Sequence, residues 1–240
     1  MNLKKVVLEL GGQDPLIVLE DADLEHAVQQ SAMSRMANNA QACINAKRIF
    51  VHEQVYDAYR EMLVREVREK FTLGDPLQKE TLVGPMARED LWLQLKKQVR
   101  DSLDHCTVVH GDTQQLHEHN HERGFFFSPI IVEDAAPDSV VAKEELFGPV
   151  FVLQRVKSAD EAVRLANDSP YGLGGSVFTT DANKAEDVLR RLESGMVVAN
   201  RMVVTDTRVP SGGIKASGFG RECGMAGIRS FTNQKAVWLY

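Results

Sequence analysis

Cysteine is scarce in this sequence of 240 residues: Cys43, Cys106 and Cys223 are far apart and odd in number. This usage excludes the disulfide framework of a small secreted protein and indicates a reducing compartment, which we expect to be the cytoplasm. No apolar run approaches the length of a membrane-spanning helix, so no membrane partner is expected. Glu9 breaks the short apolar run near the N-terminus, so we expect no signal peptide.

The sequence also lacks an excess of basic residues. It has 28 Lys and Arg against 34 Asp and Glu, which gives a net charge of -6 and makes nucleic acid a poor candidate partner. With 43% apolar and 26% charged residues, the composition is ordinary for a globular protein and excludes wholesale disorder. Sequence composition therefore predicts a compact globule and says nothing about its chemistry.

Short β-branched apolar runs alternate with longer amphipathic stretches along the whole chain. We expect strands at Lys5–Leu10, Leu16–Leu19, Arg48–His52, Thr107–Val109, Phe125–Val132, Val150–Val156, Gly175–Thr179, Gly195–Asn200 and Ala236–Tyr240. We expect helices at Asp23–Met36, Val55–Glu69, Glu89–Leu103, Ser158 or Asp160 to Ala166, Asp181–Leu192 and Arg221–Ile228. In the first helix, Leu24, Ala27, Val28 and Met33 share one face. The alternation predicts an α/β fold with a mostly parallel sheet flanked by helices.

Three residues could carry chemistry. Cys43 lies in the small-residue loop NNAQAC, where backbone N–H groups or a nearby cation could stabilise a thiolate nucleophile. Glu9 in LELGG lies between apolar neighbours, which would raise its pKa and suit a general base. Glu145 in EELFGPV precedes a turn. Taken singly, each also fits a structural role: a buried thiol, a hydrogen-bonded strand-end carboxylate and a turn residue.

Taken together, the motifs are far more specific. LELGG is followed by a Q-x-C motif thirty-four residues after Glu9 (43 − 9 = 34), then by ELFGPV, and by GREC near the end. This order resembles the aldehyde dehydrogenase superfamily over essentially the whole chain. The stretches KKVVLELGGQDPLIVLEDADLE, GPMAR and SGFGRE look most like the bacterial succinate-semialdehyde dehydrogenase branch.

The resemblance implies a role for each motif residue. Cys43 would attack an aldehyde and form a thiohemiacetal, hydride would pass to NAD or NADP, and Glu9 would activate the water that hydrolyses the resulting thioester. Glu145, Phe147 and Leu10 would contact the nicotinamide end of the cofactor. The substrate would be a small-molecule aldehyde, with succinate semialdehyde as the specific candidate.

The resemblance also implies how the chain is organised. Residues 1–230 would form the catalytic domain, and residues 231–240 would form a C-terminal oligomerisation strand. Members of the superfamily are about twice as long, and no GxGxxG fingerprint occurs here, so the nucleotide-binding half is absent from this chain. We therefore expect the isolated chain to be inactive. Its expected partners are a second copy, in a homodimer or tetramer, and a separate nucleotide-binding half.

Several positions depart from the superfamily pattern. Ala40 stands where a Gly is usual, and it would strain the cysteine loop by roughly 1 kcal/mol if that position needs a positive φ. Ser211 stands where a Phe usually helps to shape the substrate tunnel. Ala37 stands where some succinate-semialdehyde enzymes have a carboxylate-binding arginine. Arg208 is a candidate substitute, and a solvent-facing loop arginine is the competing interpretation.

Other features point to structure rather than chemistry. The histidine-rich run HEHNH, at 117–121, could bind a metal, but we expect a solvated loop and no metal. Cys106 and Cys223 are expected to be structural, and Trp92 and Trp238 to be packing residues. Two rival functions stay open on the sequence: a non-catalytic fragment that acts only as a dimerising fold module, and a cofactor-free esterase.

Overall fold

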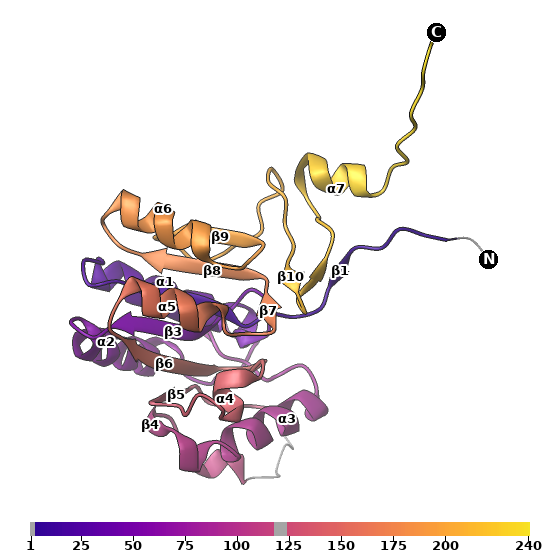
Figure 1. Cartoon of the computed structure of the whole chain (residues 1–240). Helices are drawn as coiled ribbons and strands as arrows, with labels where there is room; N and C mark the ends of the chain where they lie inside the picture. Colours follow the sequence, from indigo (N-terminus) through magenta and orange to yellow (C-terminus); the bar gives the residue numbers. More distant parts are fainter. Residues whose placement is uncertain (1–2, 118–123) are drawn as a thin grey trace.

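The computed structural model describes residues 3–117 and 124–240 and is built around one seven-stranded sheet (Figure 1). The strands lie in the order β4-β5-β6-β3-β2-β8-β9, and every neighbouring pair is parallel except β4 with β5. The strands are β2 (Asp14–Val18), β3 (Ala46–His52), β4 (Thr107–His110), β5 (Ile130–Glu133), β6 (Val150–Val156), β8 (Gly174–Phe178) and β9 (Met196–Ala199). The predicted α/β fold with a mostly parallel sheet is confirmed.

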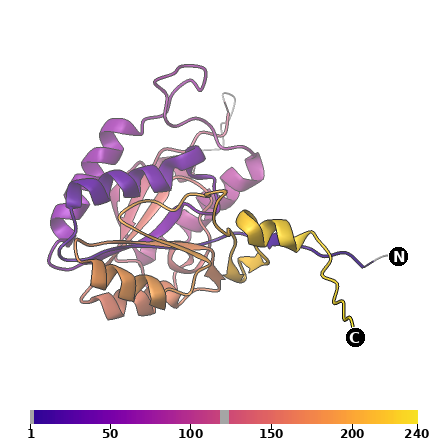
Figure 2. The same cartoon turned by 90° about the horizontal axis from the view of Figure 1, so that it is seen from above.

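Helices cover both faces of this sheet, so its strands are buried on two sides (Figure 2). One layer holds α1 and α2, and the other holds α5 and α6, with α3 and α4 towards the β4 end. The helices are α1 (Leu24–Met36), α2 (Tyr56–Lys70), α3 (Glu89–Arg100), α4 (Val140–Lys143), α5 (Ala159–Asn167), α6 (Ala182–Arg191) and α7 (Gly224–Ser230), with short 3-10 turns η1 (Ala37–Ala40), η2 (Leu103–His105) and η3 (Gln114–Leu116).

Successive side chains along each strand point to opposite faces of the sheet, so the core has one part on each face. In β2, Leu16 and Val18 pack towards α1 and α2, whereas Ile17 packs towards α5 and α6. Trp92 of α3 is 3% exposed and lies in the core cluster that also contains Leu95 and Val132, as expected for a packing residue. The helix starts follow the predicted caps, because the Asp23, Ser158 and Asp181 side chains each accept a hydrogen bond from a first-turn N–H group.

Three expectations from the sequence were wrong. The predicted buried strand Lys5–Leu10 shrinks to β1 (Leu8–Glu9), and Leu10 is 59% exposed. The predicted strand Phe125–Val132 begins only at Ile130, and Phe125 makes just an isolated β-bridge with Met86. Met33 is 56% exposed, because it follows Val28 by five residues and so lies about 140° around the helix from it. The buried face continues from Ala27 and Val28 through Ser31, Ala32 and Arg35, at the spacing of three and four residues that a helix requires.

The two ends of the chain form a small part that projects from the body (Figure 1). It contains β1 paired with β11 (Gly218–Phe219), β10 (Ile214–Lys215) paired with β7 (Tyr171–Gly172), and α7. The residues after α7 form no strand in this chain, and Trp238, expected to pack, is 79% exposed. The C-terminal strand therefore stays a prediction, since a strand at 236–240 would need a partner from outside this chain.

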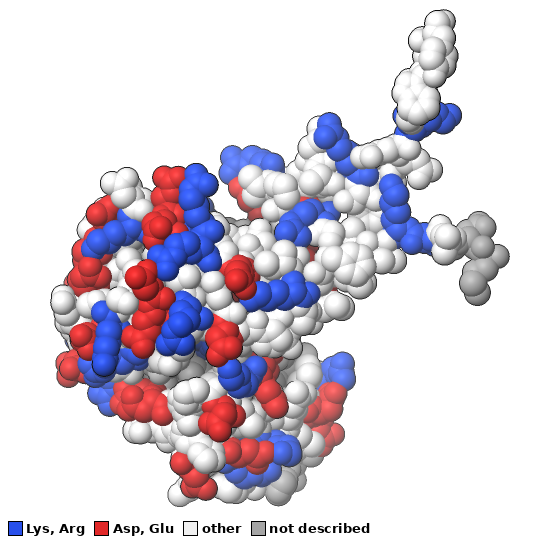
Figure 3. All heavy atoms as spheres, viewed as in Figure 1, with Lys and Arg blue, Asp and Glu red and all other residues white. Residues whose placement is uncertain are grey.

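Acidic and basic side chains intermingle over the visible face of the body, whereas the projecting part is mostly uncharged or basic (Figure 3). None of the described helices is long and apolar enough to cross a bilayer. Across residues 3–117 and 124–240, no three His, Cys, Asp or Glu side chains gather in a metal-binding group. Most of the histidine-rich run lies outside the described residues.

Arg35 of α1 ties two distant loops together from inside the core. Its side chain is 0% exposed and donates hydrogen bonds to the carbonyls of Val150 (2.7 Å), Leu146 (2.7 Å) and Gly148, and more weakly to that of Ala40 (3.4 Å). Burial lowers its pKa to about 9, which leaves the guanidinium charged at neutral pH. One side chain thus satisfies carbonyls of the loop before β6 and joins that loop to the end of η1.

We expect Arg35→Met to lower the free energy of unfolding by about 3 kcal/mol or more, because several buried carbonyls lose their donor together. Urea denaturation measures the loss. Arg65→Met on the exposed side of α2 is the matched control and should stay within about 0.5 kcal/mol of the original chain. Equal effects of the two substitutions would contradict the structural role of Arg35.

Candidate active site

The predicted site residues meet at one edge of the sheet because their segments lead into three neighbouring parallel strands. Cys43 lies just before β3, Glu145 just before β6, and Glu9 with the Gly11–Gly12 pair just before β2. Since β6, β3 and β2 are adjacent and parallel, their amino ends lie together. A Cβ built on Gly12 would lie 2.8 Å from the Cys43 carbonyl oxygen, so the two loops touch.

Amide side chains hold the cysteine loop from both ends. Asn45 accepts a hydrogen bond from the Ala42 N–H (2.7 Å) and donates to the carbonyls of Ser34 (2.5 Å) and Ala37 (3.2 Å). Asn39 donates to the carbonyls of Gly84 (3.0 Å) and Pro85 (3.2 Å), in the GPMAR turn. The loop is therefore fixed to the end of α1 and to a distant turn, which pre-organises it.

Ala40 stores strain in this loop. Asn38, Asn39 and Ala40 all have left-handed backbone conformations, with φ of 53°, 57° and 60°. Asn tolerates this region, whereas Ala at this φ pays a steric penalty of about 1–2 kcal/mol relative to the right-handed form. Position 40 therefore meets the condition under which an alanine there was expected to be strained.

Burial dominates the environment of the Cys43 thiol. The residue is half-buried, and burial raises the pKa of the thiol above its ordinary value. Lys47 and the Ile44 N–H group lower that pKa, while the carboxylates of Glu9 and Asp14 raise it. The expected cation and backbone donor are thus present, but burial and the two carboxylates outweigh them and leave the thiol protonated at rest.

The Glu9 carboxyl lies close enough to oppose ionisation of the thiol. Its own pKa is raised, chiefly by partial burial and by the Glu222 carboxylate, against smaller lowering effects of the Gly213 N–H group and of Arg221. The raised pKa predicted for Glu9 is confirmed in direction. The β1–β11 pair holds its backbone opposite Gly218, which has φ of 125° and where a Cβ would lie 1.9 Å from the Leu8 carbonyl oxygen. Only glycine fits that register.

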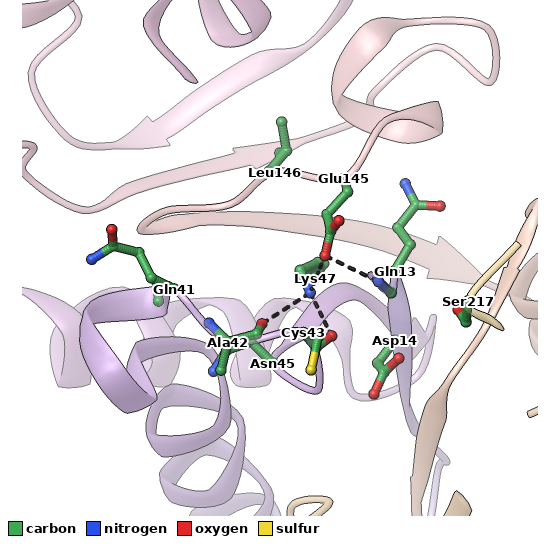
Figure 4. A network of polar contacts seen from close by, with 12 residues as sticks. Gln13, Asp14, Gln41, Ala42, Cys43, Asn45, Lys47, Glu145, Leu146 and Ser217 are labelled. Atoms are coloured by element: carbon green, nitrogen blue, oxygen red, sulfur yellow. Dashed lines mark hydrogen bonds and ion pairs between the residues drawn. The ribbon is translucent and has the colours of Figure 1, made fainter. Parts of the chain in front are cut away.

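Glu145 is engaged by two groups from the neighbouring segments (Figure 4). Its Oε1 accepts a hydrogen bond from the Gly12 N–H at 3.0 Å and pairs with Lys47 Nζ at 3.0 Å. A Cβ on Gly11 would come within 2.5 Å of Oε2, so the carboxylate lies directly over a glycine backbone. Phe147 is half-buried beside it, with Lys47 Nζ 5.9 Å from its ring centre.

These residues could hold the nicotinamide end of a dinucleotide. Gly11 places no side chain against the carboxylate of Glu145, which is partly exposed, the ring of Phe147 is partly accessible, and the side chain of Leu10 is exposed. A carboxylate can accept hydrogen bonds from ribose hydroxyls, and an aromatic ring can pack beside a planar base. The glycine-rich segment SGFGRECG leads into α7, but it lacks the GxGxxG spacing of a dinucleotide fingerprint.

The structure separates the two predicted substrate residues. Ser211 is 7% exposed and lines a cavity of about 410 Å³ between β9 and the loop that follows it. Arg208 is not among the residues that line this cavity; its exposed side chain pairs with Asp206. A substrate contact by Arg208 therefore stays a prediction, and it would require the guanidinium to leave Asp206.

Sequence reasoning missed three buried charged residues at this edge: Asp14, Arg35 and Lys47. Asp14 is fully buried with a pKa raised to about 6, chiefly by burial, and its Oδ2 has no hydrogen-bond partner among the described residues. A charged residue inside a strand pattern was a visible signal, since β2 begins with Asp14 and β3 contains Lys47. Spacing alone does not show that the two lie together.

We expect Glu9→Gln to shift the pH dependence of Cys43 alkylation to lower pH, because it removes a negative charge that opposes thiolate formation. Iodoacetamide rates, followed residue by residue with peptide mapping, give the midpoint for each cysteine. In the original folded chain the Cys43 midpoint should exceed that of the same chain in urea, where burial is lost. The midpoint of Cys106 should be unchanged by Glu9→Gln, and a shift of Cys43 to higher pH would contradict the described electrostatics.

We expect Ala40→Gly to change the free energy of unfolding by less than about 1 kcal/mol. Relief of the left-handed strain is offset by the loss of a buried methyl group, about 0.8 kcal/mol, and by greater chain entropy. Ala40→Val should instead cost about 2 kcal/mol or more, because a β-branched residue is strained at this φ and meets a packed core. Equal urea midpoints for Ala40→Gly and Ala40→Val would contradict the left-handed backbone conformation of Ala40.

Comparison with known proteins agrees with this geometry. Residues 1–237 match the model of the aldehyde dehydrogenase family. The succinate-semialdehyde dehydrogenase [NADP(+)] of Deinococcus radiodurans is 45% identical over 98% of this chain and 48% of its own length. The solved succinic semialdehyde dehydrogenase of Streptococcus pyogenes, in complex with NADP+, superposes with a TM-score of 0.90 at 34% identity, over 97% of this chain and 50% of that one. This chain spans about half the length of such relatives, and it belongs to the aldehyde dehydrogenase family.

Proposed function

We propose that this chain is the catalytic half of an NAD(P)-dependent aldehyde dehydrogenase that converts an aldehyde to its carboxylic acid. The observation that carries the proposal is the meeting of Cys43, Glu9 and Glu145 around the Gly11–Gly12 backbone. A thiol, a carboxyl of raised pKa and a carboxylate over bare backbone come from three separate segments. No shared structural role would require these three side chains at the same place in the fold.

In this proposal the Cys43 thiol releases its proton to solvent and the sulfur bonds to the aldehyde carbon, whose oxygen becomes an oxyanion. The backbone N–H of Cys43 is one donor for that oxyanion. When bound, the cofactor supplies the hydride acceptor that turns the Cys43 adduct into a thioester. Glu145 and Phe147 orient the nicotinamide end, and the exposed Leu10 borders it.

Glu9 then takes a proton from the water that attacks the thioester. The carbon–sulfur bond breaks, the carboxylic acid leaves, and Cys43 is regenerated. The partial exposure of Glu9 supports this role, because a water molecule can reach its carboxyl without entering the core. Its raised pKa also makes it a stronger base than an ordinary carboxylate.

Succinate semialdehyde is the proposed substrate, and NAD or NADP the proposed cofactor. Both rest on the relatives, which are named for this substrate and carry NADP+ in one solved structure. The relatives extend over about twice the matched length, so the pyrophosphate and adenosine contacts are assigned to a half that this chain does not contain. We therefore propose that the isolated chain does not turn over aldehydes.

The projecting part is the proposed place of assembly. It gathers exposed apolar side chains from both ends of the chain: Leu3, Val6, Phe219, Met225, Ile228, Phe231, Val237, Trp238, Leu239 and Tyr240. Large apolar side chains exposed in such number on one part of a protein favour an interaction surface. We propose that it binds a second copy of this chain, in a homodimer or tetramer, together with the nucleotide-binding half.

The test joins this chain to the cofactor half of a relative. The N-terminal half of the Deinococcus radiodurans enzyme, co-expressed with this chain or fused ahead of residue 1, should restore NADP-dependent oxidation of succinate semialdehyde. Cys43→Ala should abolish it. Glu9→Gln should still give one equivalent of reduced cofactor per site and then slow steady turnover by about 10²–10⁴-fold, because only thioester hydrolysis loses its base.

The matched control is Glu186→Gln, which removes an exposed carboxylate from α6 and should leave turnover unchanged. The isolated chain, titrated with NADP by calorimetry, should show no binding at sub-millimolar concentration. Activity that survives Cys43→Ala in the joined protein would refute the proposed nucleophile. A folded, associated pair of halves that never oxidises an aldehyde would refute the proposed function.

A further inference from the structure

Lys47 is a lysine with almost no access to solvent. It lies in β3, its side chain is 1% exposed, and three oxygens surround its ammonium group. Nζ donates to the Cys43 carbonyl at 2.7 Å and to the Ala42 carbonyl at 3.1 Å, and it pairs with Glu145 Oε1 at 3.0 Å. An ammonium group has three N–H donors, so these three contacts use all of them.

We propose that Lys47 is a positioning residue that fixes the backbone of the nucleophile Cys43 and the carboxylate of Glu145 through one buried ammonium group. This inference rests on the proposed function and extends it, because it joins the residue that attacks the aldehyde to the residue that orients the cofactor. In Figure 4 the Cys43 carbonyl points towards Lys47 and its sulfur points away, so the lysine holds the main chain and leaves the sulfur free.

The arrangement needs a cation and not only a donor. Asp14 from β2 and Glu145 from the loop before β6 both favour the charged form of Lys47, while burial and Arg35 from α1 disfavour it. Asp14 Oδ1 accepts a hydrogen bond from the Gly174 N–H at 2.9 Å, and Oδ2 has no such partner within the described part of the chain. Arg48 also acts on Asp14 and Arg35 also acts on Glu145, but Lys47 is the cation that pairs directly with the Glu145 carboxylate. A neutral side chain at position 47 would therefore weaken the charge balance of both carboxylates and remove that ion pair.

The same cation acts on the thiol. Lys47 favours the Cys43 thiolate, whereas the carboxylates of Glu9 and Asp14 oppose it. If the Lys47 ammonium group is removed, the carboxylates of Glu9 and Asp14 and the burial of the thiol still oppose thiolate formation, and no cation of this group favours it. Loss of Lys47 should therefore raise the pKa of the Cys43 thiol, an effect that the loss of a purely space-filling residue would not have.

The test compares Lys47→Met and Lys47→Arg by the pH dependence of Cys43 alkylation with iodoacetamide, measured in the full chain by peptide mapping. Cys106 serves as an internal reference in the same molecule. Lys184→Met is the matched control, since it removes an exposed lysine that pairs with Glu20. No turnover is needed, so the result is independent of the cofactor half.

Lys47→Met should raise the midpoint for Cys43 by about one pH unit, which means about tenfold less thiolate at a fixed pH below the midpoint. The alkylation rate should fall by only about threefold, because a thiolate of higher pKa is a better nucleophile. Lys47→Arg should keep the midpoint within about 0.3 units, since it retains the charge. Lys184→Met should shift neither cysteine.

An unchanged Cys43 midpoint in folded Lys47→Met, or an equal shift in Cys106, would overturn the inference. If that variant does not fold, the original chain with ¹⁵N-labelled lysine gives the answer by NMR. A Lys47 ammonium that keeps its protons up to the Cys43 midpoint supports the inference, and one that loses them below it overturns it. In either case the joined-enzyme assay tests the proposed function separately, because Cys43→Ala reports on the nucleophile without reference to Lys47.

Discussion

The parallel pairing of β6, β3 and β2 is the constraint on which the site depends. Three segments far apart in the sequence lead into these strands from the same end, and only their lateral order brings Glu145, Cys43 and Glu9 together. Ligands of open α/β sheets commonly bind at the carboxyl ends of the strands. Here the candidate reactive groups lie at the amino ends of the strands. The segments that precede the strands carry them, and not the loops that follow the strands.

Buried charges hold those loops, and they do so at a cost in desolvation. Arg35 and Lys47 satisfy main-chain carbonyls of the loops before β6 and β3, and Asp14 faces Lys47 from β2. Burial of an ion costs desolvation energy, which its bonds to otherwise unsatisfied carbonyls offset. These ions also fix the relation between the loops, because each ion has to meet its partners in one geometry. Both the satisfied carbonyls and the placement of the reactive groups explain their presence.

The sequence predicted much of the sheet, because β-branched runs and capping residues are local signals, as at Asp23 and Asp181. It also predicted the raised pKa of Glu9, and it identified position 40 as strained if its φ is positive, as it is. It did not predict the role of Lys47, whose partners lie on separate segments that no spacing rule connects. The same limit explains Leu10, since its exposure depends on which neighbours cover it and not on its own apolar character.

The mutual effect of Glu9 and Cys43 bears on the order of steps in the proposed reaction. Two anions at this edge repel each other, so the pair favours states in which one of them keeps a proton. When Glu9 keeps its proton, the thiol can release its own proton to solvent, and the thiolate is then the single anion of the pair. Once the sulfur has bonded to carbon, it carries no charge that opposes Glu9, so Glu9 can release its proton to solvent and is a carboxylate when a base is required. The electrostatics of the pair thus favour a protonated Glu9 during attack and an ionised Glu9 during hydrolysis.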